Sequence, residues 1–241
     1  MLRSQALLWD GCCNVRDLGG LPTEDGSETR FGVVVRADDV ALLSEPGWQA
    51  LRDYGVGRIV DLRHEHDGYG APVEVVRVPL VTPDGWARVD GVLEGELDPV
   101  VYRRRNYLFL LEHFPQNFAR AVAAVATAPQ GPTLIHCAGG VDRTGLVAAL
   151  LLRVAGVGIG TIAEDYAESE VSWAPTVGEW IAEAPDETER TKRRLQSVMP
   201  AAAMRDVLVE LERQHGSARG YLSRAGVEPP ELDRLRVRLR G

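Results

Sequence analysis

The chain has 241 residues, of which 45% are hydrophobic, and its 27 basic and 35 acidic side chains give a formal net charge of −8. This length predicts a single domain over residues 1–241, and the negative charge argues against a broad basic face for nucleic acid or anionic membrane. No apolar run predicts a membrane span and the first fifteen residues lack a signal-peptide pattern, so we expect a cytoplasmic protein.

Strands and helices alternate through the first 155 residues. Runs of β-branched residues predict strands at Phe31–Ala37, Gly57–Arg63, Glu74–Leu80 and Pro132–Cys137. Helices are predicted after Ser44, near Pro115, and over Arg143–Ala155. The last is nearly all apolar, so we expect it to be buried on most of its surface. This order predicts an α/β fold with a central, mostly parallel sheet flanked by helices.

Two later regions depart from this alternation. Leu80–Tyr102 carries scattered proline and glycine and predicts a loop, which a helix follows over the sheet edge. Residues 81–114 are therefore a candidate lid. The C-terminal third predicts helices only, with starts at a capping box of Thr161 and Glu164, at Pro200 and at Pro229.

The sequence HCAGGVDRTG, residues 136–145, joins the fourth strand to the buried helix. The helix directs its unpaired amides and positive dipole end into the turn, which predicts an anion cradle. Gly139 and Gly140 allow backbone conformations closed to other residues, so successive N–H groups converge as in a backbone nest. We expect phosphate to contact Ala138, Gly139, Gly140, Val141, Asp142 and Arg143.

The side chains of this turn suggest nucleophilic chemistry at phosphorus. Thiols at helix N-termini near a cation ionise readily, which predicts Cys137 as a nucleophilic thiolate. Arg143 offers a planar fork for two phosphoryl oxygens, and Thr144 is predicted to donate a hydrogen bond to the sulfur. Asp142 is a candidate general acid and base. The alternative for Asp142 is a carboxylate that pairs only with the helix dipole.

These residues resemble the protein tyrosine phosphatase superfamily, in which a cysteine, five residues and an arginine form the nucleophile loop. The DRTG ending is similar to atypical bacterial tyrosine phosphatases that also act on phosphoserine, phosphothreonine and phosphoinositides. The similarity extends to four further blocks: NVRDLGGLPTEDG (14–26), RFGVVVRADDVALL (30–43), GVGRIVDLR (55–63) and GSARGYLSRAGV (216–227). It thus covers nearly the whole chain and implies a tyrosine phosphatase-like fold.

The resemblance implies a two-step, metal-free hydrolysis through a cysteinyl-phosphate at Cys137, without a cofactor. It favours Asp142 as the general acid, and Asp84, in the loop after the third strand, is the second candidate. It also implies supporting roles near the pocket for His136, Asp61, Arg63, Asn14, Arg16 and Asp17.

One departure from the family bears on the substrate. Val141 stands where lysine is common, so the pocket loses a cation that would hold a second phosphate. A phosphorylated side chain needs less positive lining than a polyphosphorylated inositol, which favours phosphotyrosine and leaves phosphoserine and phosphothreonine open. Alternatives are a phosphoinositide or small-metabolite phosphatase, an inactive phospho-binding module, and sulfur transfer of the rhodanese type. The sequence leaves the oligomeric state open.

Four other features keep two interpretations each. The segment RHEHD (63–67) is predicted to be a solvated loop rather than a metal site, since its spacing is not that of a zinc helix. Cys12 and Cys13 are predicted bystanders, the alternative being a protective disulfide with Cys137. YRRRN (102–106) contacts an anionic substrate or forms the wet face of its helix. Trp86 either packs within its own segment or forms a wall of the substrate pocket against a phenyl ring.

Overall fold

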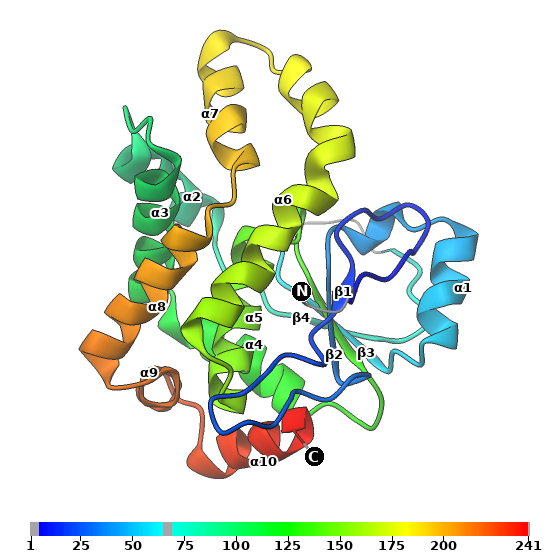
Figure 1. The fold of residues 1–241 in the computed structure, drawn as a ribbon. Helices are drawn as coiled ribbons and strands as arrows, with labels where there is room; N and C mark the ends of the chain where they lie inside the picture. The colour runs from blue at the N-terminus through cyan, green and yellow to red at the C-terminus, as the bar shows by residue number, and fades with distance from the viewer. Residues whose placement is uncertain (1–4, 65–68, 241) are drawn as a thin grey trace.

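The computed structural model describes residues 5–64 and 69–240 and contains a five-stranded sheet with helices on both faces (Figure 1). The sheet order is β1 (Arg16–Asp17), β2 (Val34–Ala37), β5 (Thr133–His136), β3 (Arg58–Asp61) and β4 (Glu74–Arg77). The last four strands are parallel, and β1 pairs antiparallel with β2. The predicted α/β fold with a mostly parallel sheet is therefore confirmed.

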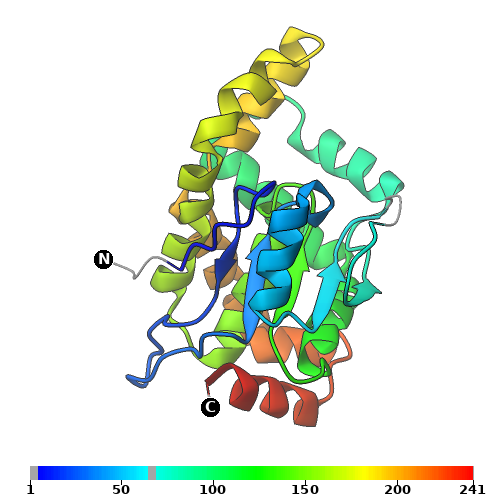
Figure 2. The same cartoon turned by 90° about the vertical axis from the view of Figure 1, so that its right-hand side faces the viewer.

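The sheet separates two hydrophobic clusters, because successive strand residues point to opposite faces. On one face α1 (Glu45–Asp53) packs on a cluster that includes Val35, Ile59 and Leu134 (Figure 2). On the other face lie α4 (Pro115–Ala126) and α5 (Asp142–Ala155), over a larger cluster that includes Val34, Val60 and Ile135. A short 3-10 helix, η1 (Val40–Leu42), follows β2.

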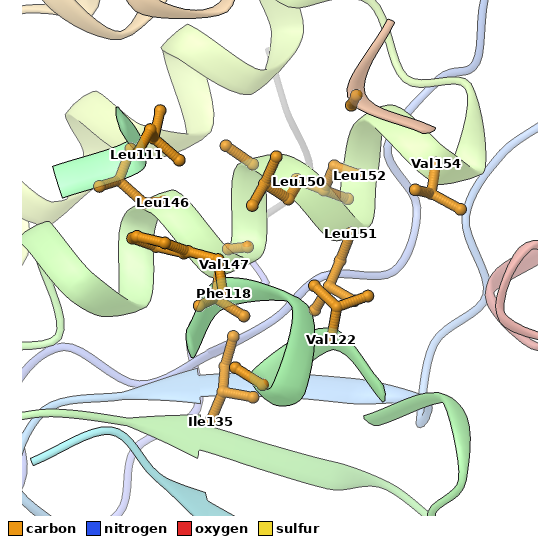
Figure 3. Packing of buried hydrophobic residues seen from close by; sticks show 14 of the residues in the cluster. Leu111, Phe118, Val122, Ile135, Leu146, Val147, Leu150, Leu151, Leu152 and Val154 are labelled. Atoms are coloured by element: carbon orange, nitrogen blue, oxygen red, sulfur yellow. The ribbon is translucent and has the colours of Figure 1, made fainter. Parts of the chain in front are cut away.

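Helix α5 is the centre of the larger cluster. Eleven of its residues are buried, which confirms the prediction made from its apolar composition. Figure 3 shows Leu146, Val147 and Leu151 of α5 beside Phe118 and Val122 of α4, above Ile135 of the sheet. This packing fixes the first turn of α5, where the nucleophile loop ends.

The prediction of a loop over Leu80–Tyr102 is wrong, because α2 (Pro83–Leu93) occupies half of it and α3 (Pro99–His113) begins within it. Pro83 and Gly85, which suggested a loop, have other roles: the proline begins α2, and the glycine lets the helix pack closely on its neighbour. Thr82 accepts a hydrogen bond from the Gly85 amide at 3.2 Å, and Pro83 occupies the first turn, where its missing N–H is harmless. A Cβ on Gly85 would lie 2.5 Å from Phe114 Cζ.

The C-terminal third is helical, as predicted: α6 (Ile159–Ala182), α7 (Glu187–Ser197), α8 (Ala201–His215), α9 (Ala218–Arg224) and α10 (Pro229–Arg240). The prediction that a capping box at Thr161 begins a helix is wrong, since α6 begins at Ile159 with Gly158 as N-cap. The second half of α6 and all of α7 rise above the rest of the molecule (Figure 1). Within the described residues, no helix has the length and apolar character to cross a membrane.

Candidate active site

The loop of residues 137–141 leaves the end of the central strand β5 and enters α5. His136 is in register with Ala37 of β2 and Asp61 of β3, so the loop emerges between two neighbouring strand ends. Val141 is the N-cap of α5, and no described side chain caps the first turn of the helix. These unpaired backbone amides and the positive end of the helix dipole lie at the carboxyl edge of the sheet, an arrangement that favours an anion.

Two carbonyl groups of the loop are held from outside. Gly139 O accepts hydrogen bonds from Asn14 Nδ2 at 3.1 Å and from Trp173 Nε1 at 3.0 Å. Gly140 O accepts one from Arg36 Nη2 at 2.8 Å. In a trans peptide the C=O and N–H point in opposite directions, so these bonds turn the next two amides, of Gly140 and Val141, toward the other side of the loop. Successive amides that point to one side of a loop are the feature of a backbone nest, the kind of structure that binds anions in proteins.

The two glycines of the loop are required for different reasons. Gly140 has a φ of +67°, which favours glycine, and a Cβ there would lie 2.6 Å from Ala37 O. Gly139 has an ordinary backbone, but a Cβ on it would lie 2.2 Å from Trp173 Cζ2. Gly140 therefore permits the turn, and Gly139 permits the close approach of α6.

Cys137 begins the loop, is 2% exposed and belongs to the larger hydrophobic cluster. Arg36 lies near it. Burial and the neighbouring Arg16 lower the pKa of Arg36 to about 10, while Asp165 and Cys137 act in the opposite direction. Arg143 is half-buried, and its guanidinium carbon lies 5.3 Å from the centre of the Trp86 ring of α2. Cys137 thus lies at the start of the loop, and Arg143 lies in the first turn of α5, directly after it.

Asp142, in the first turn of α5, forms an ion pair with Arg103 of α3. Arg103 is buried and also donates to Gln196 O in the last turn of α7 and to Val198 O, just after that helix, at 3.1 Å. Arg104 and Arg105 are exposed, so only part of the YRRRN segment forms a solvent-facing surface of the helix. Arg103 fixes the position of the Asp142 carboxylate beside the loop.

Asp84 lies in the first turn of α2 and is exposed. Within the described ranges it makes no hydrogen bond or ion pair with the loop. The same helix contacts the loop through Trp86, so α2 borders the candidate site although the Asp84 carboxylate does not contact it.

Thr144 is fully buried in the first turn of α5. Its hydroxyl has no hydrogen-bond partner among the described residues. The predicted bond from Thr144 Oγ1 to the Cys137 sulfur is therefore not formed in this structure. A buried hydroxyl without a partner costs stability, and such groups are concentrated at functional sites.

Asn14 and Arg16 lie beside the loop, whereas the contacts of Asp17 are with other parts of the chain. Arg16 donates to Asn14 Oδ1 at 2.8 Å, and Asn14 in turn holds Gly139 O. Asp17 accepts from the Gly19 and Gly32 amides at 2.6 and 2.8 Å and from the Tyr54 hydroxyl, so it organises the chain below β1. Burial raises the pKa of Asp17 despite these bonds.

Asp61, Arg63 and His136 form a second polar group beneath the loop. Arg63 pairs with Asp61 at 2.9 Å and with Asp39 at 2.6 Å, and His136 Nε2 lies 3.5 Å from Asp61 Oδ2. Burial opposes ionisation of Asp61, yet bonds from His136 and Arg63 hold the pKa of its carboxyl well below the usual range. These residues contact one another and support the strand ends on either side of Cys137.

Sequence analysis missed a buried ionic network that joins α6 to the loop. Asp165 accepts from Arg16 Nε and Arg36 Nη1, both at 2.9 Å, and Ser169 lies within hydrogen-bond distance of both arginines. The signal was present in the sequence. Asp165 and Ser169 share one face of α6 with Ile162 and Tyr166, and a carboxylate on a buried helix face requires a cationic partner.

The three cysteines are free thiols, so the disulfide alternative for Cys137 is not formed here. Asp38 accepts from Cys13 N at 2.9 Å and from Cys13 Sγ at 3.2 Å. Burial and this carboxylate raise the pKa of Cys13 to about 12. The described residues contain no cluster of three or more His, Cys, Asp or Glu suited to a metal ion, while residues 65–67 of RHEHD lie outside them.

Comparison with known proteins agrees with this geometry. The chain matches the tyrosine phosphatase family over residues 7–241. It is 32% identical to a tyrosine-protein phosphatase of Nostoc commune, over 85% of this chain and 73% of that one. It is 28% identical to the triple specificity protein phosphatase PtpB of Mycobacterium tuberculosis, over 96% and 98% respectively.

A Cupriavidus necator protein that carries a provisional tyrosine-protein phosphatase name is 34% identical over 174 residues, which are 68% of this chain and 62% of that protein's length. The match to the family covers nearly the whole chain and includes the nucleophile loop. The chain therefore belongs to the tyrosine phosphatase family of phosphoric monoester hydrolases.

Proposed function

We propose that the protein hydrolyses phosphotyrosine through a cysteinyl-phosphate intermediate on Cys137. The observation that carries this proposal is the pair of carbonyls held from outside the loop, at Gly139 and Gly140. They aim the following amides at the side where the uncapped start of α5 also points. An anion cradle built in this way beside a thiol matches the needs of a phosphoryl group under nucleophilic attack.

In the first step the Cys137 thiolate attacks phosphorus, a P–S bond forms, and the P–O bond to the leaving group breaks. Arg143 and the loop amides hold the three equatorial oxygens and stabilise the charge on them. In the second step water attacks phosphorus, the P–S bond breaks, and inorganic phosphate and the thiolate are released. Every group in this sequence comes from residues 137–143.

Asp142 serves both steps in this proposal. It protonates the leaving oxygen in the first and takes a proton from water in the second. Its support is its place between the loop and Arg143, and its ion pair with Arg103 fixes where the carboxylate lies. Asp84 is the alternative acid; it reaches the substrate only if α2 shifts, because its carboxylate has no described contact with the loop.

The charges around the loop favour a single phosphoryl group over a polyphosphorylated inositol. The cations nearest the loop are already paired with carboxylates: Arg16 and Arg36 with Asp165, Arg63 with Asp61 and Asp39, and Arg103 with Asp142. Within the described ranges, Arg143 makes no ion pair. One guanidinium and the loop amides match one phosphoryl dianion, and Val141 adds no further charge.

The test is hydrolysis of para-nitrophenyl phosphate by the wild type, Cys137→Ser and Cys13→Ser. We expect turnover by the wild type and by the Cys13 variant, whose thiol donates to Asp38 and lies outside the nucleophile loop, and none by Cys137→Ser. Trapping of a phosphorylated cysteine by rapid acid quench and mass spectrometry tests the intermediate. An inactive wild type would favour the phospho-binding module or sulfur transfer, and an active Cys137→Ser variant would remove Cys137 as the nucleophile.

A further inference from the structure

A pocket of about 410 Å³ lies beside the nucleophile loop and is not used by the chemistry described above. Ligand pockets in proteins begin at about 300 Å³, so it is large enough for a side chain or small group. Its walls come from three segments that meet at the loop: Gly11, Cys12 and Cys13; Asp38 and Leu42; and Trp173, Thr176 and Trp180 of α6, with Ala138 and Gly139 at the base.

The α6 wall is a rigid aromatic surface. Trp173, Thr176 and Trp180 lie at i, i+3 and i+7, so they share one face of the helix. The rings of Trp173 and Trp180 meet edge to face, with centroids 5.5 Å apart and planes at 86°. Arg193 of α7 lies 5.2 Å from the Trp180 ring and donates to Trp180 O at 2.5 Å. The aromatic wall is therefore held in place without a ligand.

The facing wall is closely packed and offers little charge. A Cβ on Gly11 would lie 2.0 Å from Leu42 O, so the two segments touch through their backbones. The Leu42 side chain is 64% exposed at the rim. Asp38 is the acidic residue of the pocket, and its carboxylate already accepts from the Cys13 amide and thiol and from the Asn14 amide. The pocket thus presents an apolar surface.

We infer that this pocket is a subsite for an apolar side chain next to the phosphorylated residue of a peptide substrate. The inference rests on the proposed function and follows from continuity: Ala138 and Gly139 belong to both the phosphate loop and the pocket wall. Neighbouring Cα atoms in a peptide are 3.8 Å apart, so a residue one or two positions from the phosphorylated one can reach across the exposed Ala138 to the pocket.

This assignment narrows the substrate class to phosphorylated proteins. Leucine or phenylalanine would contact Trp180 on one side and Leu42 on the other. An inositol headgroup or a small phosphorylated metabolite carries no such side chain and would leave the apolar pocket in water. Burial of one large apolar side chain corresponds to roughly tenfold or more in kcat/KM.

The test uses pairs of phosphotyrosine peptides that differ only in leucine or serine at one position, from two residues before the phosphotyrosine to two after it. We expect the wild type to favour leucine about tenfold at one of these positions. Trp180→Ala and Leu42→Ala, on opposite walls, should each bring this ratio close to one. Val171→Ala, exposed on the same helix, is the matched control and should keep the ratio.

The leucine-to-serine ratio is taken within each variant, so a general loss of active protein cancels. If the wild type shows no preference at any position, or if the preference survives in both pocket variants, the subsite is wrong. Turnover of para-nitrophenyl phosphate by the wild type separates the two proposals. Its absence defeats the proposed function, whereas turnover without a peptide preference defeats the subsite alone.

Discussion

The nucleophile loop has two surroundings that are built differently. Beneath it, Arg16, Arg36 and Asp165 form a buried ionic network in which each side chain is at most 6% exposed. Around it, helices α2, α3 and α6 contact the loop through single side chains: Trp86 on Arg143, Arg103 on Asp142 and Trp173 on Gly139. We call the ionic network the support and helices α2, α3 and α6 the cover. The support is held together by many bonds, whereas each helix of the cover contacts the loop region through one described side chain.

This difference separates chemistry from specificity. In the network, Arg36 holds Gly140 O directly, and Arg16 holds Asn14, which donates to Gly139 O. In the proposed reaction this orients the loop amides before a substrate arrives, which is the preorganisation that electrostatic catalysis requires. The covering helices carry Arg103, the partner of the proposed acid Asp142, and one wall of the apolar pocket. Changes in the support should therefore alter folding, and changes in the cover should alter rates and substrate preference.

The largest effect is expected for Asp165→Asn, which leaves two buried guanidinium groups without their anion. Removal of one partner of a buried ion pair costs about 3–5 kcal/mol in the free energy of unfolding. Urea denaturation measures this loss. The control is Asp233→Asn, because Asp233 pairs with Arg219 at the surface and is 69% exposed, so about 0–1 kcal/mol is expected. Equal losses in the two variants would contradict the buried network.

The same carboxylate predicts how stability depends on pH. Burial opposes its ionisation, yet Arg16 and Arg36 hold the pKa of Asp165 below its usual value. A lowered pKa in the folded state adds stability that is present above the ordinary value of about 3.9 and is lost as the pH falls through the folded value. Urea midpoints between pH 6 and pH 3 should therefore fall more steeply in the wild type than in Asp165→Asn.

Arg143→Lys tests the proposed binding of the phosphoryl oxygens by Arg143, whose guanidinium contacts Trp86 of the cover. Lysine cannot make two parallel bonds, so kcat/KM for para-nitrophenyl phosphate should fall about 100- to 1000-fold. The melting temperature should change little, because among the described residues Arg143 makes no ion pair. Arg88→Lys on α2, whose guanidinium lies over Phe109, is the control. A near-normal rate in Arg143→Lys would contradict the bidentate role.

The loop and its support show how far the sequence predicts this structure. The β5–loop–α5 unit follows from local signals: a β-branched strand, two glycines and an apolar helix. The network does not, because Asp165 meets Arg16 and Arg36 across 149 and 129 positions of the chain. Such contacts depend on the tertiary arrangement. Asn14 and Arg16 were nevertheless placed near the pocket by family resemblance.

The covering helices show where local signals mislead. Pro83 and Gly85 suggested a loop, yet in α2 the first begins the helix and the second permits contact with Phe114. Thr161 suggested a helix start, yet α6 begins two residues earlier and continues past Pro175. Proline and glycine are compatible both with a helix end and with a loop, and the packing of the segment determines which of the two forms.

Asp142→Asn and Asp84→Asn should separate the two candidate acids. We expect Asp142→Asn to lower kcat about a hundredfold for a phosphopeptide, whose leaving group needs a proton, and less for para-nitrophenyl phosphate. It should also remove the limb of the pH–rate profile that reports leaving-group protonation. Asp84→Asn should change kcat at most slightly, since its exposed carboxylate makes no described contact with the loop. The opposite result would assign the acid to α2.

The smallest effect is expected for Trp173→Phe, which removes one of two donors to Gly139 O and keeps most of the ring. A neutral hydrogen bond contributes about 0.5–1.5 kcal/mol, so kcat/KM for para-nitrophenyl phosphate should fall roughly two- to tenfold. Trp48→Phe on α1, stacked on Tyr69, is the control. Asn14 still holds the same carbonyl in this variant. A loss above a hundredfold would mean that Gly139 O depends on Trp173 alone, and no loss would mean that Asn14 is sufficient. Either result would contradict a carbonyl that both donors hold in place.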